Sequence, residues 1–206
     1  MRDMERLLEG FRIFKADYWE RHRGRFESLA QAGQAPRALV IGCSDSRVDP
    51  QLLFQTVPGE IFAVRNVANL VPPYAPDAEY HGTSAALEFA VCGLAVEHVV
   101  VLGHSRCGGI AALLQGPAPG HDFVLPWMGI AATARERALA HAAAHGGDRQ
   151  LLCEREGIKV SLENLRGFPW IRAALESGRL ALHGWHFDIE NGTLTALGPD
   201  GNFAPV

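Results

Sequence analysis

Two short, uninterrupted apolar runs constrain the fold of this chain more than any other feature. Residues 38–42 read ALVIG and residues 99–102 read VVVL, and neither run alternates with polar residues. Runs of this length are typical of strands that are covered on both faces, as in parallel sheets. They are far shorter than the roughly 18 apolar residues that a membrane-spanning helix needs, so no span is expected.

Helix and turn signals separate the predicted strands. Asp49 and Pro50 supply an N-cap and a first helical position for a short helix through Phe54, and a second strand is expected over 61–64. A hairpin joined by Asn191-Gly192 is expected near the C-terminus. The remaining helices are expected over 82–94, 110–114, 122–145 and 149–165 and from Pro169. This alternation predicts an α/β fold, with a central, mainly parallel β-sheet flanked by helices and an antiparallel C-terminal hairpin at the sheet edge.

The N-terminal segment carries large apolar side chains near a helical period. They stand among charged residues and are Leu7, Leu8, Phe11, Phe14, Tyr18 and Trp19. Such a segment forms amphipathic helices that pack either on the chain's own core or on another subunit. We expect one domain with an N-terminal helical arm over 1–34, an α/β core that carries the site over 35–120, and a helical region with the hairpin over 121–206.

Composition and charge narrow the class of protein. The chain has 206 residues, 48% of them hydrophobic, and a formal net charge of -4, so no basic excess favours nucleic acid or an anionic membrane. The first residues are charged and are followed by no apolar targeting segment, so a cytoplasmic location is expected. Four cysteines are too few for a disulfide framework in such a chain, which leaves reduced thiols or metal-bound thiolates.

Two polar clusters follow two of the predicted strands. Cys43 to Arg47 and His104 to Cys107 each begin where a strand ends, and ligands bind at that edge of open parallel sheets. Two cysteines and a histidine are a known catalytic zinc set, with a fourth position left for water or substrate. Taken alone, His104 and Cys107 are also compatible with a buried turn histidine and an inert thiol.

Asp45 and Arg47 stand two residues apart in the first cluster. They are compatible with a surface ion pair, which contributes little to stability. Alternatively, Arg47 fixes the Asp45 carboxylate as an acceptor that orients hydroxide on the metal. Spacing alone leaves both interpretations open.

Six segments together match one enzyme family. They are CSDSRVDP (43–50), PGEIFAVRNVANLVPP (58–73), HGTSAALEFAV (81–91), VVVLGHSRCGGI (99–110), VSLENLRGFPWI (160–171) and LHGWHFDIENG (182–192). By these segments, and above all by the paired CSDSR and HSRCGG motifs, the chain resembles the beta class of carbonic anhydrases, of the plant-like or bacterial type with an open active site.

The resemblance implies roles for individual residues. One Zn2+ per chain is expected on Cys43, His104 and Cys107, with Asp45 and Arg47 as the catalytic dyad and Asp45 as a fourth ligand only in a closed state. Gln34 matches a glutamine that in some members reaches the active site across a dimer interface. The positions implied for the carbon dioxide pocket are Phe62, Val67, Phe89 and Gly108, and some relatives have tyrosine where Phe89 stands.

The activity implied is the reversible hydration of carbon dioxide to bicarbonate and a proton by zinc-bound hydroxide, in a homodimer or a dimer of dimers. Hydrolysis of carbon disulfide or carbonyl sulfide on the same fold is an alternative, as is a non-catalytic zinc or redox-sensing module. A phosphate-binding turn over 103–109 is disfavoured, because the GxGxxG and P-loop spacings are absent.

One regulatory feature of some family members is expected to be missing. Their non-catalytic bicarbonate pocket uses a tryptophan, an arginine and a tyrosine, whereas the matching residues here are Val40, Arg65 and Phe187. The remaining Arg65 is expected to form a structural ion pair, and Asp45 is expected to pair with Arg47 in an open site.

Overall fold

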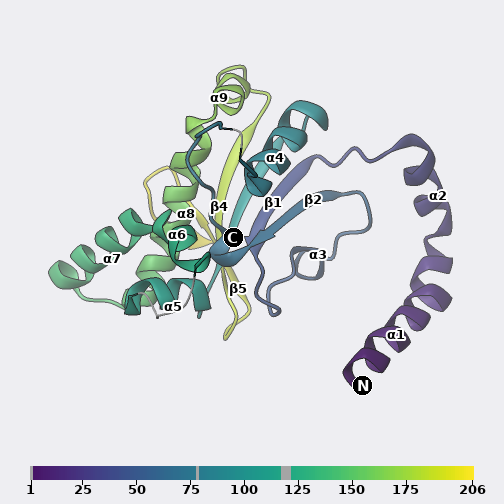
Figure 1. Ribbon diagram of the computed structural model, residues 1–206, viewed down its shortest axis with the longest axis horizontal. Helices are drawn as coiled ribbons and strands as arrows, with labels where there is room; N and C mark the ends of the chain where they lie inside the picture. The colour runs from purple at the N-terminus through teal and green to yellow at the C-terminus, as the bar shows by residue number, and fades with distance from the viewer. Residues whose placement is uncertain (1, 78, 117–121) are drawn as a thin grey trace.

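A six-stranded mixed sheet forms the centre of the molecule in the computed structural model, which describes residues 2–77, 79–116 and 122–206 (Figure 1). Its strand order is β2-β1-β3-β4-β5-β6. The first four strands are parallel and the last two antiparallel, so the predicted mainly parallel sheet with an antiparallel edge is confirmed. The strands are β1 (Ala38–Cys43), β2 (Ile61–Asn66), β3 (His98–His104), β4 (Ala181–Asp188), β5 (Thr193–Leu197) and the short, unpredicted β6 (Phe203–Pro205).

The helices largely follow the sequence signals. Asp49 caps α3, since its side chain accepts hydrogen bonds from the backbone N–H groups of Gln51 and Leu52. The helices are α1 (Arg2–Phe14), η1 (Lys15–Trp19), α2 (Arg23–Ala32), α3 (Pro50–Leu53), η2 (Val67–Asn69), α4 (Gly82–Glu88), η3 (Phe89–Gly93), α5 (Gly108–Gln115), α6 (Val124–Gly129), α7 (Ala132–His145), α8 (Arg149–Gly167) and α9 (Pro169–Glu176).

The prediction of one helix over 122–145 is wrong, because α6 and α7 are separate. The chain turns at Ala131, which is fully buried and leaves helical geometry with φ -96° and ψ 14°. Gly129, a weak helix former, ends α6 two residues before Ala131. The turn separates α7 from α6, and the indole of Trp127 on α6 hydrogen-bonds the Val67 carbonyl.

The two faces of the sheet are covered differently. On one face, Leu39, Ile41, Val99 and Val101 pack with apolar residues of α4, α8 and α9. On the other face, Val40, Val100 and Leu102 pack with smaller elements, including Leu53 and Phe54 around α3. The larger helices α4, α8 and α9 therefore lie on one side of the sheet and the short α3 on the other (Figure 1).

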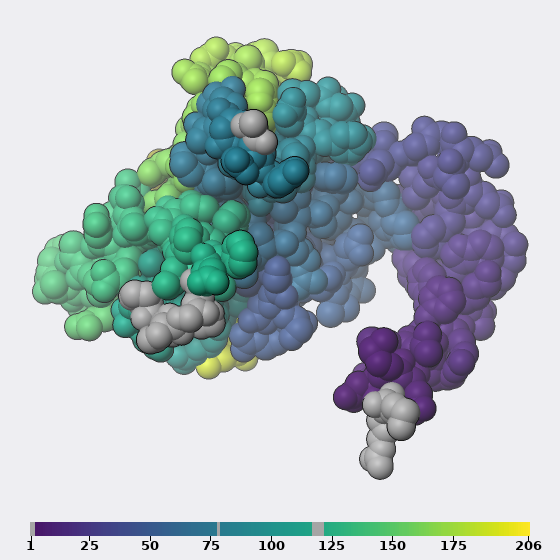
Figure 2. Space-filling model, in the orientation of Figure 1, coloured from purple at the N-terminus to yellow at the C-terminus, as the bar shows by residue number. Residues whose placement is uncertain are grey.

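The N-terminal arm, α1 to α2, stands away from the rest of the molecule (Figures 1 and 2). Figure 2 shows a hollow between the arm and the core. The arm meets the core at its base, where the Arg25 side chain donates a hydrogen bond to the Pro58 carbonyl. Its apolar side chains remain exposed, Leu7 at 66% and Phe11 at 60%. Within one chain, the arm therefore leaves these apolar side chains exposed.

Among the described residues, no helix combines the length and the apolar character that crossing a bilayer requires.

Candidate metal centre

Adjacent strands bring the two polar clusters together, as their positions in the sequence predict. Cys43 ends β1, His104 ends β3, and these strands pair in parallel. Cys107 lies three residues further on, at the N-cap of α5. The ligand atoms of the three side chains all lie within 4.8 Å of one another, and all three residues are buried.

The His104 imidazole is oriented as a ligand. Its Nδ1 lies 2.9 Å from the Ser105 carbonyl oxygen, which only a protonated Nδ1 can satisfy. The other nitrogen, Nε2, is buried and has no hydrogen-bond partner. Burial lowers the pKa of His104, but contact with Cys43, Ser105 and Asp45 outweighs burial and raises it overall. A buried imidazole nitrogen without a hydrogen-bond partner is unfavourable, unless a metal ion accepts its lone pair.

Backbone amides surround both sulfurs. Cys107 stands at the N-cap of α5, and the nearby backbone N–H groups of Gly109 and Ile110 act to lower the pKa of its thiol. The backbone N–H groups of Asp45 and Ala68 have the same effect on the pKa of Cys43. The close approach of the two sulfurs holds the pKa of Cys43 well below its usual range and raises that of Cys107. Amide donors and a helix N-terminus stabilise thiolates, the form in which cysteine binds metals.

This donor set fits zinc. Two buried sulfurs and an imidazole nitrogen with a free lone pair are ligands that Zn2+ prefers, whereas magnesium and calcium prefer oxygen. Three protein ligands also leave the fourth tetrahedral position for water or substrate, as in catalytic zinc sites.

The Asp45 carboxylate lies beside the cluster and is held by Arg47. Arg47 donates from Nε to Oδ1 at 2.9 Å, from Nη2 to Oδ2 at 2.7 Å, and from its backbone N–H to Oδ1 at 3.0 Å. These bonds, first of all those from the side chain, hold the pKa of Asp45 well below its usual range. Asp45 Oδ2 lies 4.0 Å from His104 Nε2, so the carboxylate is an ionised acceptor next to the three ligands.

Arg65 forms a structural ion pair. The sequence predicts this pair, because Val40 and Phe187 replace the tryptophan and tyrosine that would complete a bicarbonate pocket with Arg65. Its Nη1 lies 2.8 Å from Asp49 Oδ2, and the same guanidinium donates to the backbone carbonyls of Cys43 and Asp45. Val40 is buried among apolar neighbours, and Phe187 packs against the same cluster. Arg65 thereby fixes the loop that carries the first ligand and the dyad.

Sequence reasoning missed the residues of α8 that support the second loop. Glu154 is buried, and its Oε1 accepts a hydrogen bond from the Cys107 backbone N–H at 3.0 Å. Its Oε2 lies 3.1 Å from Nε2 of the buried His186. A signal was available, because Glu154 falls on the apolar face of the predicted helix over 149–165, where an unpaired carboxylate is unfavourable.

Two of the residues expected to line the carbon dioxide pocket, Phe62 and Phe89, lie side by side. The rings of Phe62 and Phe89 lie 5.8 Å apart, and 53% of Phe89 is exposed. Gly108 is exposed at the start of α5.

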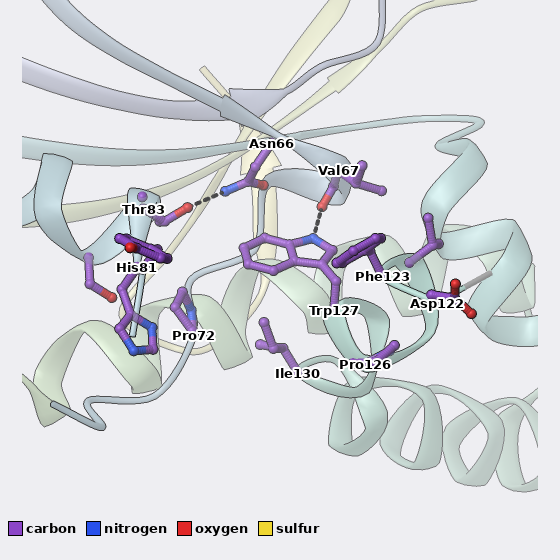
Figure 3. Close-up of a pocket in the computed structure, with 14 residues that line it drawn as sticks. Asn66, Val67, Pro72, His81, Thr83, Asp122, Phe123, Pro126, Trp127 and Ile130 are labelled. Carbon is purple, nitrogen blue, oxygen red and sulfur yellow. Dashed lines mark hydrogen bonds between the residues drawn. The ribbon is translucent and has the colours of Figure 1, made fainter. Parts of the chain in front are cut away.

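Val67 lines a separate groove of about 660 Å³ with His81, Phe123 and Trp127 (Figure 3). The Trp127 indole donates a 2.7 Å hydrogen bond to the Val67 carbonyl at this groove. Neither Phe62 nor Phe89 lines it.

Gln34 lies far from the cluster of its own chain. It is exposed in the segment that enters β1, whereas Cys43 ends that strand. At about 3.3 Å per residue, the six-residue strand β1 places Ala38 about 17 Å from Cys43, and Gln34 stands four residues before Ala38. Gln34 therefore cannot contact the cluster of its own chain.

Comparisons with known proteins agree with this geometry. The family model described as carbonic anhydrase matches residues 38–194. A carbonic anhydrase of Pseudomonas aeruginosa is 43% identical over 200 residues, which cover 94% of this chain and 87% of the relative. This chain belongs to the beta-carbonic anhydrase family.

Two solved beta-carbonic anhydrases show how far the likeness extends. The structure of CcaA superposes with a TM-score of 0.93 at 37% identity, covering 100% of this chain and 93% of that one. A tetrameric beta-carbonic anhydrase from Sordaria macrospora gives a TM-score of 0.85 at 32% identity, covering 96% of this chain and 98% of that one. The family predicted from the sequence motifs is confirmed, and the alternative functions are not favoured.

Proposed function

We propose that this carbonic anhydrase catalyses the reversible hydration of carbon dioxide with one Zn2+ per chain on Cys43, His104 and Cys107. The observation that carries the metal assignment is the buried, unpartnered His104 Nε2 beside two buried sulfurs. Among the described residues, this is the one group of three or more histidine, cysteine or acidic side chains arranged to hold a metal. A bound zinc ion supplies a Lewis acid that lowers the pKa of water, so that hydroxide is available near neutral pH.

Asp45 orients the nucleophile. Arg47 donates to both carboxylate oxygens, which keeps the group ionised and directed toward the cluster. An ionised carboxylate only accepts hydrogen bonds, so the hydrogen of the nucleophile points to Asp45 and a lone pair is free for carbon dioxide. Because Asp45 pairs with Arg47, we assign an open site, with Asp45 as a fourth ligand only in a closed state.

Carbon dioxide has no net dipole and suits an apolar wall. We assign that wall to Phe62, Val67 and Phe89, with Gly108 leaving room beside Cys107. The exposure of Phe89 and Val67 in one chain, 53% and 39%, is consistent with a wall completed by a second copy. Bicarbonate then leaves, water replaces it, and the proton passes to buffer.

A homodimer, or a dimer of two such dimers, is the proposed assembly. The arm exposes Leu7, Leu8 and Phe11, and a related enzyme from Sordaria macrospora is described as tetrameric. Gln34 would reach the active site of the partner, since it cannot reach its own. Light scattering on the active enzyme tests this assembly, and an active monomer would contradict it.

A cytoplasmic location is part of the proposal. All four cysteines are free thiols, which suits a reducing compartment.

The decisive experiment measures zinc and activity on one sample. Elemental analysis is expected to give one zinc per chain, and the same protein should hydrate carbon dioxide. A sulfide-release assay with carbon disulfide or carbonyl sulfide tests the hydrolase alternative. Stoichiometric zinc without hydration would instead support a non-catalytic zinc module.

A further inference from the structure

Glu154 is a buried acidic residue that has no role in the mechanism proposed above. Its side chain is 2% exposed, as is expected only of a carboxylate with good partners. Oε1 accepts hydrogen bonds from the Cys107 backbone N–H and from Gln150 Nε2, both at 3.0 Å, and Oε2 contacts His186 Nε2 at 3.1 Å. The Glu154 carboxylate therefore has three polar partners, and one of them is the backbone N–H of the proposed metal ligand Cys107.

The Cys107 backbone has no other way to satisfy this N–H. Cys107 stands at the N-cap of α5, so its amide lies before the helical hydrogen-bond ladder begins. Its carbonyl accepts a bond from Ala111 within α5 and a longer one, at 3.4 Å, from Gln150 Nε2. Glu154 and Gln150 therefore hold both backbone groups of this ligand residue.

The helix that carries Glu154 is a rigid support. One turn further along α8, Ile158 packs so tightly under β3 that a Cβ atom on Gly103 would lie 2.7 Å from it. Two turns further, the Ser161 hydroxyl accepts a hydrogen bond from the Val71 backbone N–H at 3.2 Å. Side chains of α8 thus contact Gly103, which precedes His104, and the backbone of Cys107, which follows it.

The loop held in this way is backbone-strained. Arg106, between the two ligands of the loop, has φ +59°, a conformation that non-glycine residues adopt only when their surroundings impose it. Without its contacts to α8, the loop would relax toward other conformations and would have to be reordered whenever metal binds.

We propose that Glu154, paired with His186, is a positioning residue that fixes the His104–Cys107 loop on α8 and thereby sets the affinity of the site for Zn2+. The inference rests on the proposed zinc site and adds a residue that the ligand set does not include. Outer residues that hold metal ligands typically change metal affinity by about 10- to 100-fold when removed.

The test compares three variants with the wild type by zinc titration against a competing chelator. Glu154→Ala removes all three contacts and is expected to weaken zinc binding by about 10- to 100-fold. Glu154→Gln keeps them, because its amide oxygen accepts from Cys107 and Gln150 and its NH2 donates to an unprotonated His186 nitrogen. This variant is expected to bind zinc within a few-fold of wild type.

Cys153→Ala is the matched control. Cys153 is adjacent on α8 and fully buried, and it packs beside the site without a hydrogen bond to the loop. It should lower the melting temperature and leave zinc affinity unchanged. Cobalt-substituted protein gives a second readout, since the sulfur-to-cobalt absorption bands should shift in Glu154→Ala and match wild type in Cys153→Ala.

Gln150→Ala, which removes only the weaker support, covers the case in which Glu154→Ala does not fold. It is expected to weaken zinc binding several-fold. The positioning role is overturned if the wild type binds zinc and Glu154→Ala, or Gln150→Ala in its place, binds it equally well. It is also overturned if Cys153→Ala loses as much affinity. If the wild type itself binds no zinc, the proposed zinc site fails and the positioning role with it.

Discussion

The two loops that carry the proposed metal ligands are held by opposite chemistry. Arg65 donates to the backbone carbonyls of the first loop, whereas Glu154 accepts a backbone N–H of the second. The Arg65 side chain is 30% exposed and pairs with the partly exposed Asp49, while Glu154 and His186 are almost completely buried.

The difference matches what each loop carries. The first loop carries one proposed ligand and the proposed dyad of Asp45 and Arg47, which faces the open side of the site. The second loop carries the other two proposed ligands in a buried position. We therefore expect damage to the first loop to reduce turnover with the metal retained, and damage to the second to reduce metal affinity.

The largest effect is expected from losing a ligand. In Cys107→Ser or Cys43→Ser a weak alcohol replaces a thiolate, so both variants should lose zinc and hydration activity. Elemental analysis of the purified proteins checks this. Full zinc and full activity in Cys107→Ser would refute the ligand assignment.

Asp45→Asn should separate turnover from metal binding. The amide can present its NH2 to the nucleophile, so hydration should fall by about 10- to 100-fold while zinc stays stoichiometric. Asp77→Asn, which breaks an exposed pair with His81, is the control and should change neither quantity. Undiminished hydration in Asp45→Asn would exclude the orienting role.

Arg65→Met tests the comparison between the loops directly. It removes the donors to the Cys43 and Asp45 carbonyls, so the unfolding free energy should fall by about 1–3 kcal/mol and hydration by several-fold. Zinc affinity should fall less than in Glu154→Ala. If Arg65→Met loses zinc as readily as Glu154→Ala, it is wrong that the first loop mainly affects turnover and the second mainly affects metal affinity.

The smallest effect concerns acid stability. The pKa of Asp45 is lowered in the folded state, so its contribution is fully present above the unfolded value of about 3.9 and is lost as pH falls through the folded value. Asp45→Asn should thus be less stable than wild type by about 1 kcal/mol, constantly between about pH 5 and pH 8. Urea unfolding across this range measures the difference, which should begin to shrink only below about pH 4. A difference that disappears near pH 6 would show that another group is responsible.

The sequence alone determined the parallel strands, the grouping of Cys43, His104 and Cys107, and the family. Unalternating apolar runs can be buried on both faces only within a covered sheet, and Cys43 and His104 follow directly where such runs end. The ends of adjacent parallel strands meet whatever the details of packing. Asp49 and Pro50 likewise fixed the start of α3, because capping is a local interaction.

Only the tertiary structure decided what supports the site. Glu154 and Cys107 are 47 residues apart, and their contact depends on how α8 crosses β3, which no local pattern encodes. The break between α6 and α7 also escaped the sequence, since an alanine-rich segment favours one continuous helix until packing requires a turn. Features such as helix caps and strand ends can be predicted from neighbouring residues in the sequence. The partners of a buried charge such as Glu154 depend instead on how distant helices and strands pack.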